Sequence, residues 1–337
     1  MLKDLQHELL VDIRKQIVLH NVSTISELSK VTHVSFPTVK KMIDDMIVRG
    51  EVIEHGQKAP EGGRPAKSYG YNPEFRHCLT LYIEAREIRY RLINCQHQIV
   101  EDGVFLVTDS HLEALGELVD SFIEDKTKIG AISVGVAAAV DMGRIVFAPE
   151  YPSLAHLDLK HWLMERTGLP VVIENDMNAA VYGFSKRDET TTYQSIVYLG
   201  LGKNGPGAGI LFDGHVARGQ SGFSGEVSFL PLYDDASFYD RIKDKPYGPN
   251  VLKREEIDAL GRLVATFAAT LNPHAFIFSN VDLVQDDLLH INHACERYLP
   301  SRHIPVLRIG QWEEDYFSGL ARLGIELTLE TIQRGDV

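Results

Sequence analysis

Cysteine is scarce in this chain of 337 residues. The three that occur, Cys78, Cys95 and Cys295, are scattered, odd in number and without any paired spacing. Such usage encodes neither a disulfide framework nor a cysteine-rich zinc site. We therefore expect no bound metal.

Long hydrophobic runs are also missing. No apolar stretch reaches about 18 residues, the length expected of a membrane-spanning helix. No signal-peptide pattern precedes Leu2. These absences predict a soluble, cytoplasmic protein that does not interact with a membrane.

Basic residues are in short supply outside the N-terminal region. Residues 1–70 carry 10 Lys and Arg against 9 Asp and Glu, whereas the remainder carries 24 against 38. An acidic body repels a polyanion, so contact with nucleic acid should be confined to the N-terminal region. We expect a small domain over residues 1–72 and a larger body over residues 73–337, which is long enough for a substantial core.

A winged helix-turn-helix is predicted between residues 24 and 67. Thr24 and Glu27 have the spacing of a capping box, and Ser35 precedes a second helix with Pro37 in its first turn. Two short strands around a Gly- and Pro-rich loop would form the wing. The apolar positions expected to pack inward are Ile25, Leu28 and Val31 in the first helix and Val39, Met42, Ile43, Met46 and Ile47 in the second.

The start of the second helix is the end that a recognition helix presents to DNA. Asp44 and Asp45 at its far end would repel DNA, so only the first turns should enter a groove. Cations on the wing favour DNA binding over the alternative, a protein-binding or purely structural winged helix. The residues predicted to contact DNA are Ser35, Phe36, Thr38, Lys40 and Lys41 on the helix and Lys58, Arg64 and Lys67 on the wing.

The remaining residues predict an α/β body with two lobes and a cleft between them. The predicted elements of the first half are strands over 78–83, 87–95 and 98–107, a helix over 111–125 and a strand over 129–136. Those of the second half are strands over 195–201, 208–212 and 215–218, with helices after Glu255.

A buried strand runs directly into a helix at residues 171–180, with Asn175 and Asp176 at the junction. Either residue could simply cap the helix. Alternatively, a carboxylate at a strand end can hold a ligand hydroxyl in a cleft or act as a general base. Glycine-dense segments follow at 200–209 and 219–227, which suits a close approach of the backbone to a ligand or a tight hairpin.

These segments closely resemble the ROK family of repressors, open reading frames and kinases. The resemblance rests on VVIENDMNAAVYG at 171–183, YLGLGKNGPGAGILFDGHVARGQSGFSGEV at 198–227 and GGRPAKSYGYNP at 62–73. It implies an actin-like, sugar-kinase-type fold for the body. It also implies that Asn175, Asp176 and Glu226 contact a sugar, and that Arg64 reaches the DNA minor groove. In kinase members, Asp176 would be the catalytic base.

The chain departs from the family's kinases at several positions. The phosphate-binding turn D-I-G-G-T is replaced by residues 82–86, with Glu84 and Arg86, and the histidine shared by sugar and zinc is replaced by Phe229. The cysteine-rich zinc loop is replaced by residues 232–250, which contain no cysteine. The turn Gly-x-Pro-Gly, which lies near the sugar in the family's kinases, is replaced in this chain by Gly135-Val136-Ala137-Ala138.

We therefore expect a DNA-binding regulator, a repressor of carbohydrate genes, rather than an enzyme, with no catalytic residues and no cofactor. Its partners would be double-stranded operator DNA and a sugar effector in the cleft. A homodimer or homotetramer is expected, because regulators of this kind bind paired half-sites. Two alternatives stay open: a regulator that has lost its sugar, and a sugar kinase with an altered phosphate loop.

Overall fold

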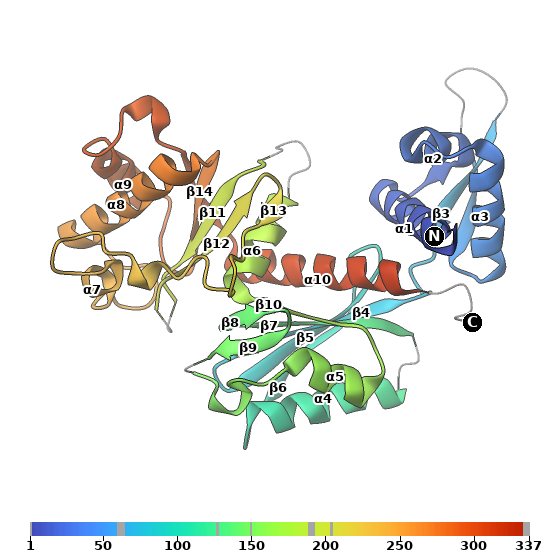
Figure 1. The fold of residues 1–337 in the computed structure, drawn as a ribbon, viewed down its shortest axis with the longest axis horizontal. Helices are drawn as coiled ribbons and strands as arrows, with labels where there is room; N and C mark the ends of the chain where they lie inside the picture. Colours follow the sequence, from blue (N-terminus) through green and yellow to red (C-terminus); the bar gives the residue numbers. More distant parts are fainter. Residues whose placement is uncertain are drawn as a thin grey trace.

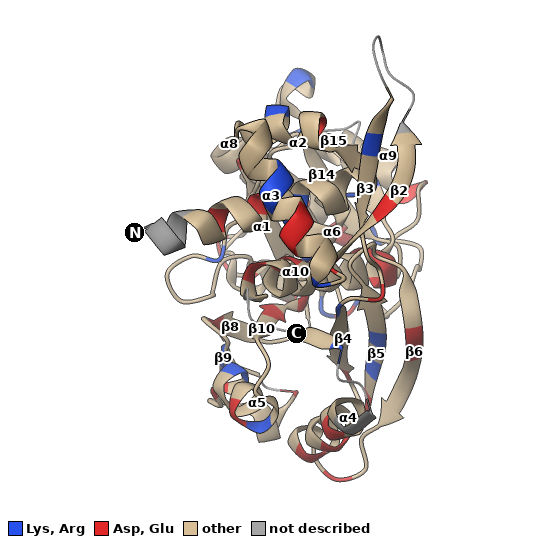
Figure 2. Cartoon of the chain, turned by 90° about the vertical axis from the view of Figure 1, so that its right-hand side faces the viewer, with Lys and Arg blue, Asp and Glu red and all other residues tan. Residues whose placement is uncertain are grey.

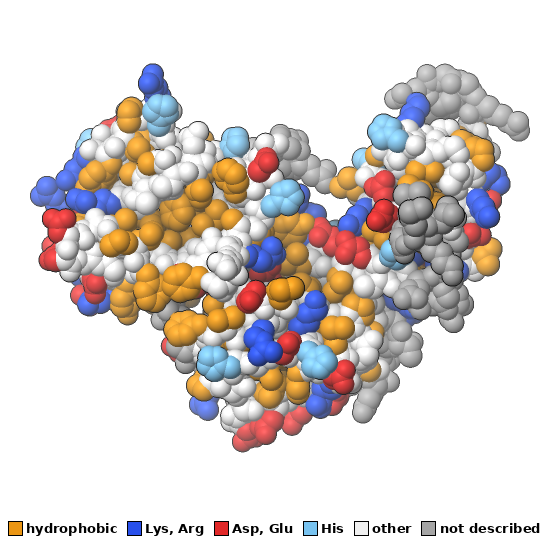
Figure 3. Space-filling view, viewed as in Figure 1, with side chains coloured by type: hydrophobic (Ala, Val, Ile, Leu, Met, Phe, Trp, Pro, Cys, Tyr) orange, Lys and Arg blue, Asp and Glu red, His pale blue; other side chains and the backbone are white. Residues whose placement is uncertain are grey.

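The computed structural model describes residues 2–58, 65–125, 128–148, 150–187, 193–202 and 205–332. It places an N-terminal helix-turn-helix with a β-hairpin beside two α/β lobes (Figure 1). The long helix α10 (Trp312–Thr331) lies where the three parts meet. In Figure 3, a notch at the top of the molecule separates the N-terminal part from the second lobe.

The N-terminal part contains the helix-turn-helix predicted from the sequence. Thr24 N–H donates to the Glu27 carboxylate at 2.7 Å, and Glu27 N–H donates to the Thr24 hydroxyl, so the predicted capping box is present. His33 adopts a left-handed conformation, φ 56°, in the turn between the two helices. The elements are α1 (Leu2–His20), β1 (Ser23–Thr24), α2 (Ile25–Thr32), α3 (Phe36–Val48), β2 (Val52–Lys58) and β3 (Ala66–Tyr71).

Details of these helices differ from the prediction. Val31 is 49% exposed and Ile47 is 37% exposed, so the expectation that both pack inward was wrong. In α2 the inward position is taken by Thr32 instead. Ser35 precedes α3 as predicted, but its hydroxyl lies 2.8 Å from the Thr38 hydroxyl and does not cap a main-chain N–H. The sequence reading also did not anticipate α1.

The first lobe is built on a sheet with the strand order β10-β7-β4-β5-β6. The strands β10, β7 and β4 are parallel neighbours, while β4, β5 and β6 form an antiparallel meander. Its elements are β4 (His77–Glu84), β5 (Glu87–Asn94), β6 (Ile99–Leu106), α4 (His111–Asp125), β7 (Ile129–Val136), β8 (Ala139–Asp141), β9 (Arg144–Phe147), the 3-10 helix Pro152–Leu154, α5 (Leu159–Thr167) and β10 (Val171–Asn175).

The second lobe follows α6 (Asp176–Ser185) and has the strand order β13-β12-β11-β14-β15. Helices α8 and α9 cover it on the left of Figure 1. Its elements are β11 (Ile196–Gly200), β12 (Gly207–Phe212), β13 (His215–Val216), the 3-10 helix Val227–Phe229, α7 (Phe238–Ile242), α8 (Arg254–Leu271), β14 (Ala275–Ser279), α9 (Asp287–Cys295), the 3-10 helix Ser301–His303 and β15 (Val306–Gly310).

The predicted two-lobed α/β body is therefore confirmed. The helix and strand expected over 111–125 and 129–136 coincide with α4 and β7. All three cysteines are free and buried, and burial raises the pKa of the Cys78 thiol to about 11 and those of Cys95 and Cys295 to about 12. These thiols therefore act as small apolar groups in the cores.

Helix α10 belongs to two cores at once. Tyr316, Phe317 and Leu320 pack with α6 and with the second-lobe strands β11 and β14. From the next residue onward, Ala321, Ile325 and Leu329 pack with the helix-turn-helix and with first-lobe residues such as Cys78 and Ile93. A single helix thus contacts both lobes and, near its end, the N-terminal part as well.

Candidate functional site

A cleft of about 620 Å³ lies between the two lobes. Its first-lobe wall includes Tyr82 and Glu84 at the end of β4, and its floor includes Trp312 and Tyr316 of α10. Asn175, Asp176 and Glu226, which the sequence predicted as ligand residues, all line the same cleft although Glu226 is fifty residues from Asp176 in the chain.

Asn175 acts as the helix cap. Its side-chain oxygen accepts from Asn178 N–H at 3.0 Å, and its Nδ2 donates to Ala138 O at 3.0 Å and to Asp176 Oδ1 at 2.9 Å. The capping alternative is therefore correct for this residue. Both the oxygen and the nitrogen of the Asn175 amide already make hydrogen bonds within the protein. Asn175 can therefore orient the Asp176 carboxylate as well as contact a ligand.

The Asp176 carboxyl has a raised pKa. Burial raises the pKa of its carboxyl to about 7, and the charge of Glu226 acts in the same direction. Hydrogen bonds from Met177 N–H and Asn175 to Oδ1 oppose this rise but do not cancel it. Burial also raises the pKa of Glu226. The cleft therefore holds one carboxyl group whose pKa lies near neutral pH and a second whose pKa is also raised.

An ion pair next to Asp176 crosses from one lobe to the other. Glu174 in β10, 5% exposed at its side chain, pairs with Arg218 after β13, with Arg218 Nε donating at 3.0 Å. Asn178 also donates to Glu174, at 3.1 Å. Sequence reasoning missed this pair, although a charged residue inside the apolar run 171–174 was a usable signal.

The turn that would cradle phosphate in a kinase is occupied by side chains. Glu84 ends β4 and accepts a 2.7 Å hydrogen bond from the Tyr82 hydroxyl. Ala85 follows in a left-handed conformation, φ 49°, and Arg86 is exposed. On the opposite side of the cleft, Asp282 accepts from Leu201 N–H at 2.8 Å in the glycine-dense segment. Asp282 was also missed, because nothing local marks it.

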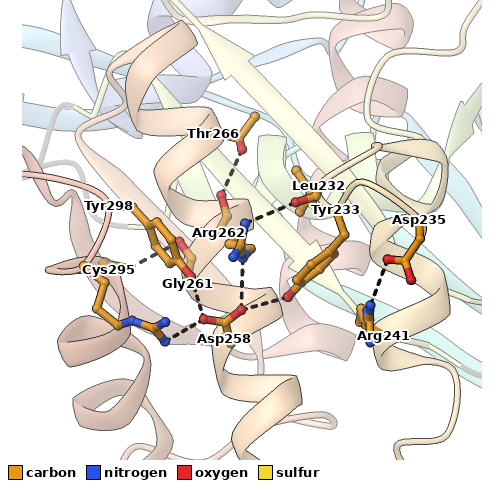
Figure 4. A network of polar contacts seen from close by, with 11 residues as sticks. Leu232, Tyr233, Asp235, Arg241, Asp258, Gly261, Arg262, Thr266, Cys295 and Tyr298 are labelled. Atoms are coloured by element: carbon orange, nitrogen blue, oxygen red, sulfur yellow. Dashed lines mark hydrogen bonds and ion pairs between the residues drawn. The ribbon is translucent and has the colours of Figure 1, made fainter.

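The segment that replaces the family's zinc loop is held by a polar network (Figure 4). Asp258 of α8 accepts from Tyr233 at 3.0 Å, Arg262 at 2.9 Å, Arg297 at 2.7 Å and Tyr298 at 2.6 Å. Figure 4 shows Arg262 of α8, Tyr298 beyond the end of α9 and Tyr233 of the 232–250 segment converging on the Asp258 carboxylate. Among the described residues, no group of three or more His, Cys, Asp or Glu is arranged to hold a metal ion.

The predicted DNA-contacting residues of α3 lie on its exposed face, opposite the buried stripe. Ser35, Phe36, Thr38, Lys40 and Lys41 are all exposed. Lys40 pairs with Asp44 at 2.9 Å, so the positive and negative residues of α3 are neighbours (Figure 2).

On the wing, Lys67 of β3 pairs with Glu54 of β2 at 2.9 Å, and this carboxylate raises the pKa of the lysine. Arg64 and the side chain of Lys58 lie outside the described residues. Two of the predicted phosphate-contacting lysines thus already have an acidic neighbour, which the sequence reading did not foresee.

Comparison with known proteins supports the resemblance to the ROK family. The model of the ROK family matches residues 83–238, which include the cleft residues Asn175, Asp176 and Glu226. The match covers 156 of the 337 residues of the chain. A xylose repressor of Bacillus spizizenii is 26% identical over 230 residues, covering 65% of this chain. A glucokinase of Streptomyces coelicolor is 31% identical over 128 residues, covering 36% of this chain and 40% of the kinase.

Among solved structures, a ROK family transcriptional regulator, described as a homolog of the E. coli MLC protein, has the same fold. Its TM-score is 0.73 at 16% identity, covering 97% of this chain and 98% of that one. The matched part spans 59% of the length of the xylose repressor. Within the described residues, no helix is both long and apolar enough to cross a membrane.

Proposed function

We propose that this protein is a transcriptional repressor that binds operator DNA through α3 and the β2–β3 wing, and that a sugar in the cleft controls it. The observation that carries the proposal is the position of α10. This helix lines the ligand cleft with Trp312 and Tyr316 and packs against the helix-turn-helix with Ile325 and Leu329. A xylose repressor among the relatives supports the same reading.

The same geometry supports a mechanism by which binding of a sugar in the cleft changes the affinity for DNA. A ligand shifts an equilibrium only by binding one arrangement more tightly than another. Closure of the lobes around a sugar would act on α6, which carries Asp176 and packs on α10. Movement of α10 would then reorient the helix-turn-helix of each subunit. In a homodimer or homotetramer, this changes the distance between recognition helices and hence the fit to paired half-sites.

We further infer that the chain has no kinase activity. Phosphoryl transfer depends on donors and a metal arranged around the phosphates. Here Glu84 places a carboxylate at the first phosphate turn, and Asp282 accepts from an amide of the glycine-dense segment. Both acids oppose the binding of a nucleotide.

Operator binding tests the proposal. Selection of bound sequences from a random DNA library with the full-length protein should yield a two-fold symmetric site. Lys40→Ala and Lys41→Ala should then weaken binding almost uniformly across sequences and lower the salt slope by about one per lost phosphate contact. Arg64→Ala should weaken AT-rich sites most.

Lys160→Ala, which removes an exposed lysine from the first lobe, provides the control and should leave affinity unchanged. No enrichment of any sequence, or wild-type affinity in all three helix and wing variants, would contradict the proposed DNA surface. If the protein binds the operator but no sugar changes its operator affinity, the alternative of a regulator that works without a sugar is favoured.

A further inference from the structure

The charges of the cleft indicate the chemical class of its ligand, an inference that rests on the proposed function. The cleft walls are strongly acidic. Arg86 is the one Lys or Arg among its described lining residues, and its side chain is exposed. The carboxylates that line the cleft are Glu84, Glu150, Asp176, Glu226 and Asp282.

Two of these acids stand where a phosphate would need donors. Asp282 is 2% exposed and accepts from Leu201 N–H at 2.8 Å, with Gly202 N–H as a second donor. Its carboxylate therefore already fills the anion position that this glycine-dense segment offers. Glu84, across the cleft, accepts from the Tyr82 hydroxyl and presents a second carboxylate to the cleft. A phosphorylated ligand would meet repulsion on both sides.

The inner end of the cleft offers a different environment. The Tyr316 hydroxyl is buried, lies near Asp176 and finds no hydrogen-bond partner among the described residues. An unpartnered buried hydroxyl is costly, so a ligand that pairs with it is favoured. Around it, the ring centroid of Tyr316 lies 4.8 Å from that of Tyr82 and 5.3 Å from that of Trp312. Such a wall suits a sugar ring and also attracts a cation.

Asp176 and Glu226 repel each other across this end. Neither has an Arg, Lys or His partner among the described ion pairs, in contrast to the neighbouring Glu174, which has Arg218. A positive group between them would relieve the repulsion and supply charge-assisted hydrogen bonds to both. We propose that the cleft binds an unphosphorylated sugar that carries a protonated amine, with the amine at Asp176 and Glu226 and the ring on Tyr316 and Trp312.

Calorimetry on the full-length protein at pH 7 tests this proposal. The probes are D-glucosamine, D-galactosamine and D-mannosamine, each compared with its parent hexose, its N-acetyl derivative and the hexose 6-phosphate. At least one amino sugar should bind ten-fold or more tightly than its three matched compounds. Asp176→Asn and Glu226→Gln, which remove charge with little change of shape, should each reduce that preference at least ten-fold.

Asp286→Asn, an exposed acid beside α9 and outside the cleft lining, is the matched control and should change nothing. Tyr316→Phe should weaken the amino sugar and its parent hexose alike. Tighter binding of a parent hexose, N-acetyl sugar or sugar phosphate would overturn the proposal. So would an amine preference that survives in both acid variants, or an absence of binding by every probe.

Operator binding, measured on the same preparation without sugar, separates the two hypotheses. Intact operator binding without an amine preference would overturn the ligand class alone. Amine-selective binding together with no sequence-specific DNA binding would instead support the cleft chemistry and contradict the regulatory function.

Discussion

Arg14 of α1 donates from Nη1 to the carbonyl oxygens of Leu329, at 3.1 Å, and Ile332, at 3.0 Å, at the end of α10. The same guanidinium pairs with Glu51, and both side chains are fully buried. Carbonyl groups in the last turn of a helix lack intrahelical donors, and a cation there is favoured by the helix dipole. Arg14 thus joins the first helix of the chain to the last.

We predict that Arg14→Met destabilises the protein by about 3–5 kcal/mol, the usual cost of removing one partner from a buried ion pair. Glu51 would keep only Arg49, at 3.0 Å, and the carbonyl groups of α10 would lose their donor. Chemical denaturation gives the free energy of unfolding.

Lys15→Met is the matched control, since Lys15 joins α1 to Glu330 of α10 through an exposed pair. Such surface pairs contribute about 0–1 kcal/mol. Equal effects of the two substitutions would show that Arg14 does not hold the two helices together.

We predict that Asp44→Asn strengthens operator binding. The exposed Lys40 ammonium now lies 2.9 Å from Asp44, and removal of the carboxylate would free the lysine for a phosphate and remove a repulsive charge. Affinity should rise several-fold at low salt and converge on the wild-type value at high salt, because salt screens exposed charges. Fluorescence anisotropy across a salt series measures this. Unchanged affinity at low salt would mean that Asp44 and Lys40 lie away from the DNA.

We predict no ATP-dependent phosphorylation of hexoses or amino sugars in the presence of magnesium. The physical reason is the pair of carboxylates Glu84 and Asp282 at the two loops that would hold the phosphates. A coupled ADP-release assay is sufficient, with Asp176→Asn as the check for contaminating kinase. Product formation that scales with protein and disappears in that variant would contradict the prediction.

We predict a characteristic pH dependence of stability from Asp176. Its pKa is raised from 3.8 to about 7 in the folded protein, so between these values the folded state binds a proton that the unfolded state has released. Stability should therefore fall as pH rises from about 4 to about 7, by at most about 1.4 kcal/mol per pH unit from this group.

Asp176→Asn should remove this contribution. Relative to the wild type, the variant should gain stability as pH rises through that window and show a constant difference above about pH 8. Thermal melting at a series of pH values is the measurement. A difference that does not change between pH 4 and pH 8 would show that the pKa of Asp176 is not raised.

The local elements were readable from the sequence because their signals are local. The Thr24–Glu27 capping box, α4 and the strand-to-helix junction at Asn175 each depend on residues within about four positions or on a regular apolar period. The same signals wrongly predicted that Val31 and Ile47 are buried. A helical period shows which face of a helix is apolar but not how wide the buried part of that face is.

The sequence by itself therefore determined the helix-turn-helix and the two-lobed α/β body, and its resemblance to the ROK family singled out Asp176 and Glu226, which both line the cleft. Tertiary structure alone decided which distant groups meet: Arg14 with Leu329, Glu174 with Arg218, and Asp282 with Leu201. No periodicity encodes such pairs, since their partners lie 44 to 315 residues apart in the chain. They exist because packing the lobes and α1 around α10 brings those side chains to the same place, where burial makes each unpaired polar group costly.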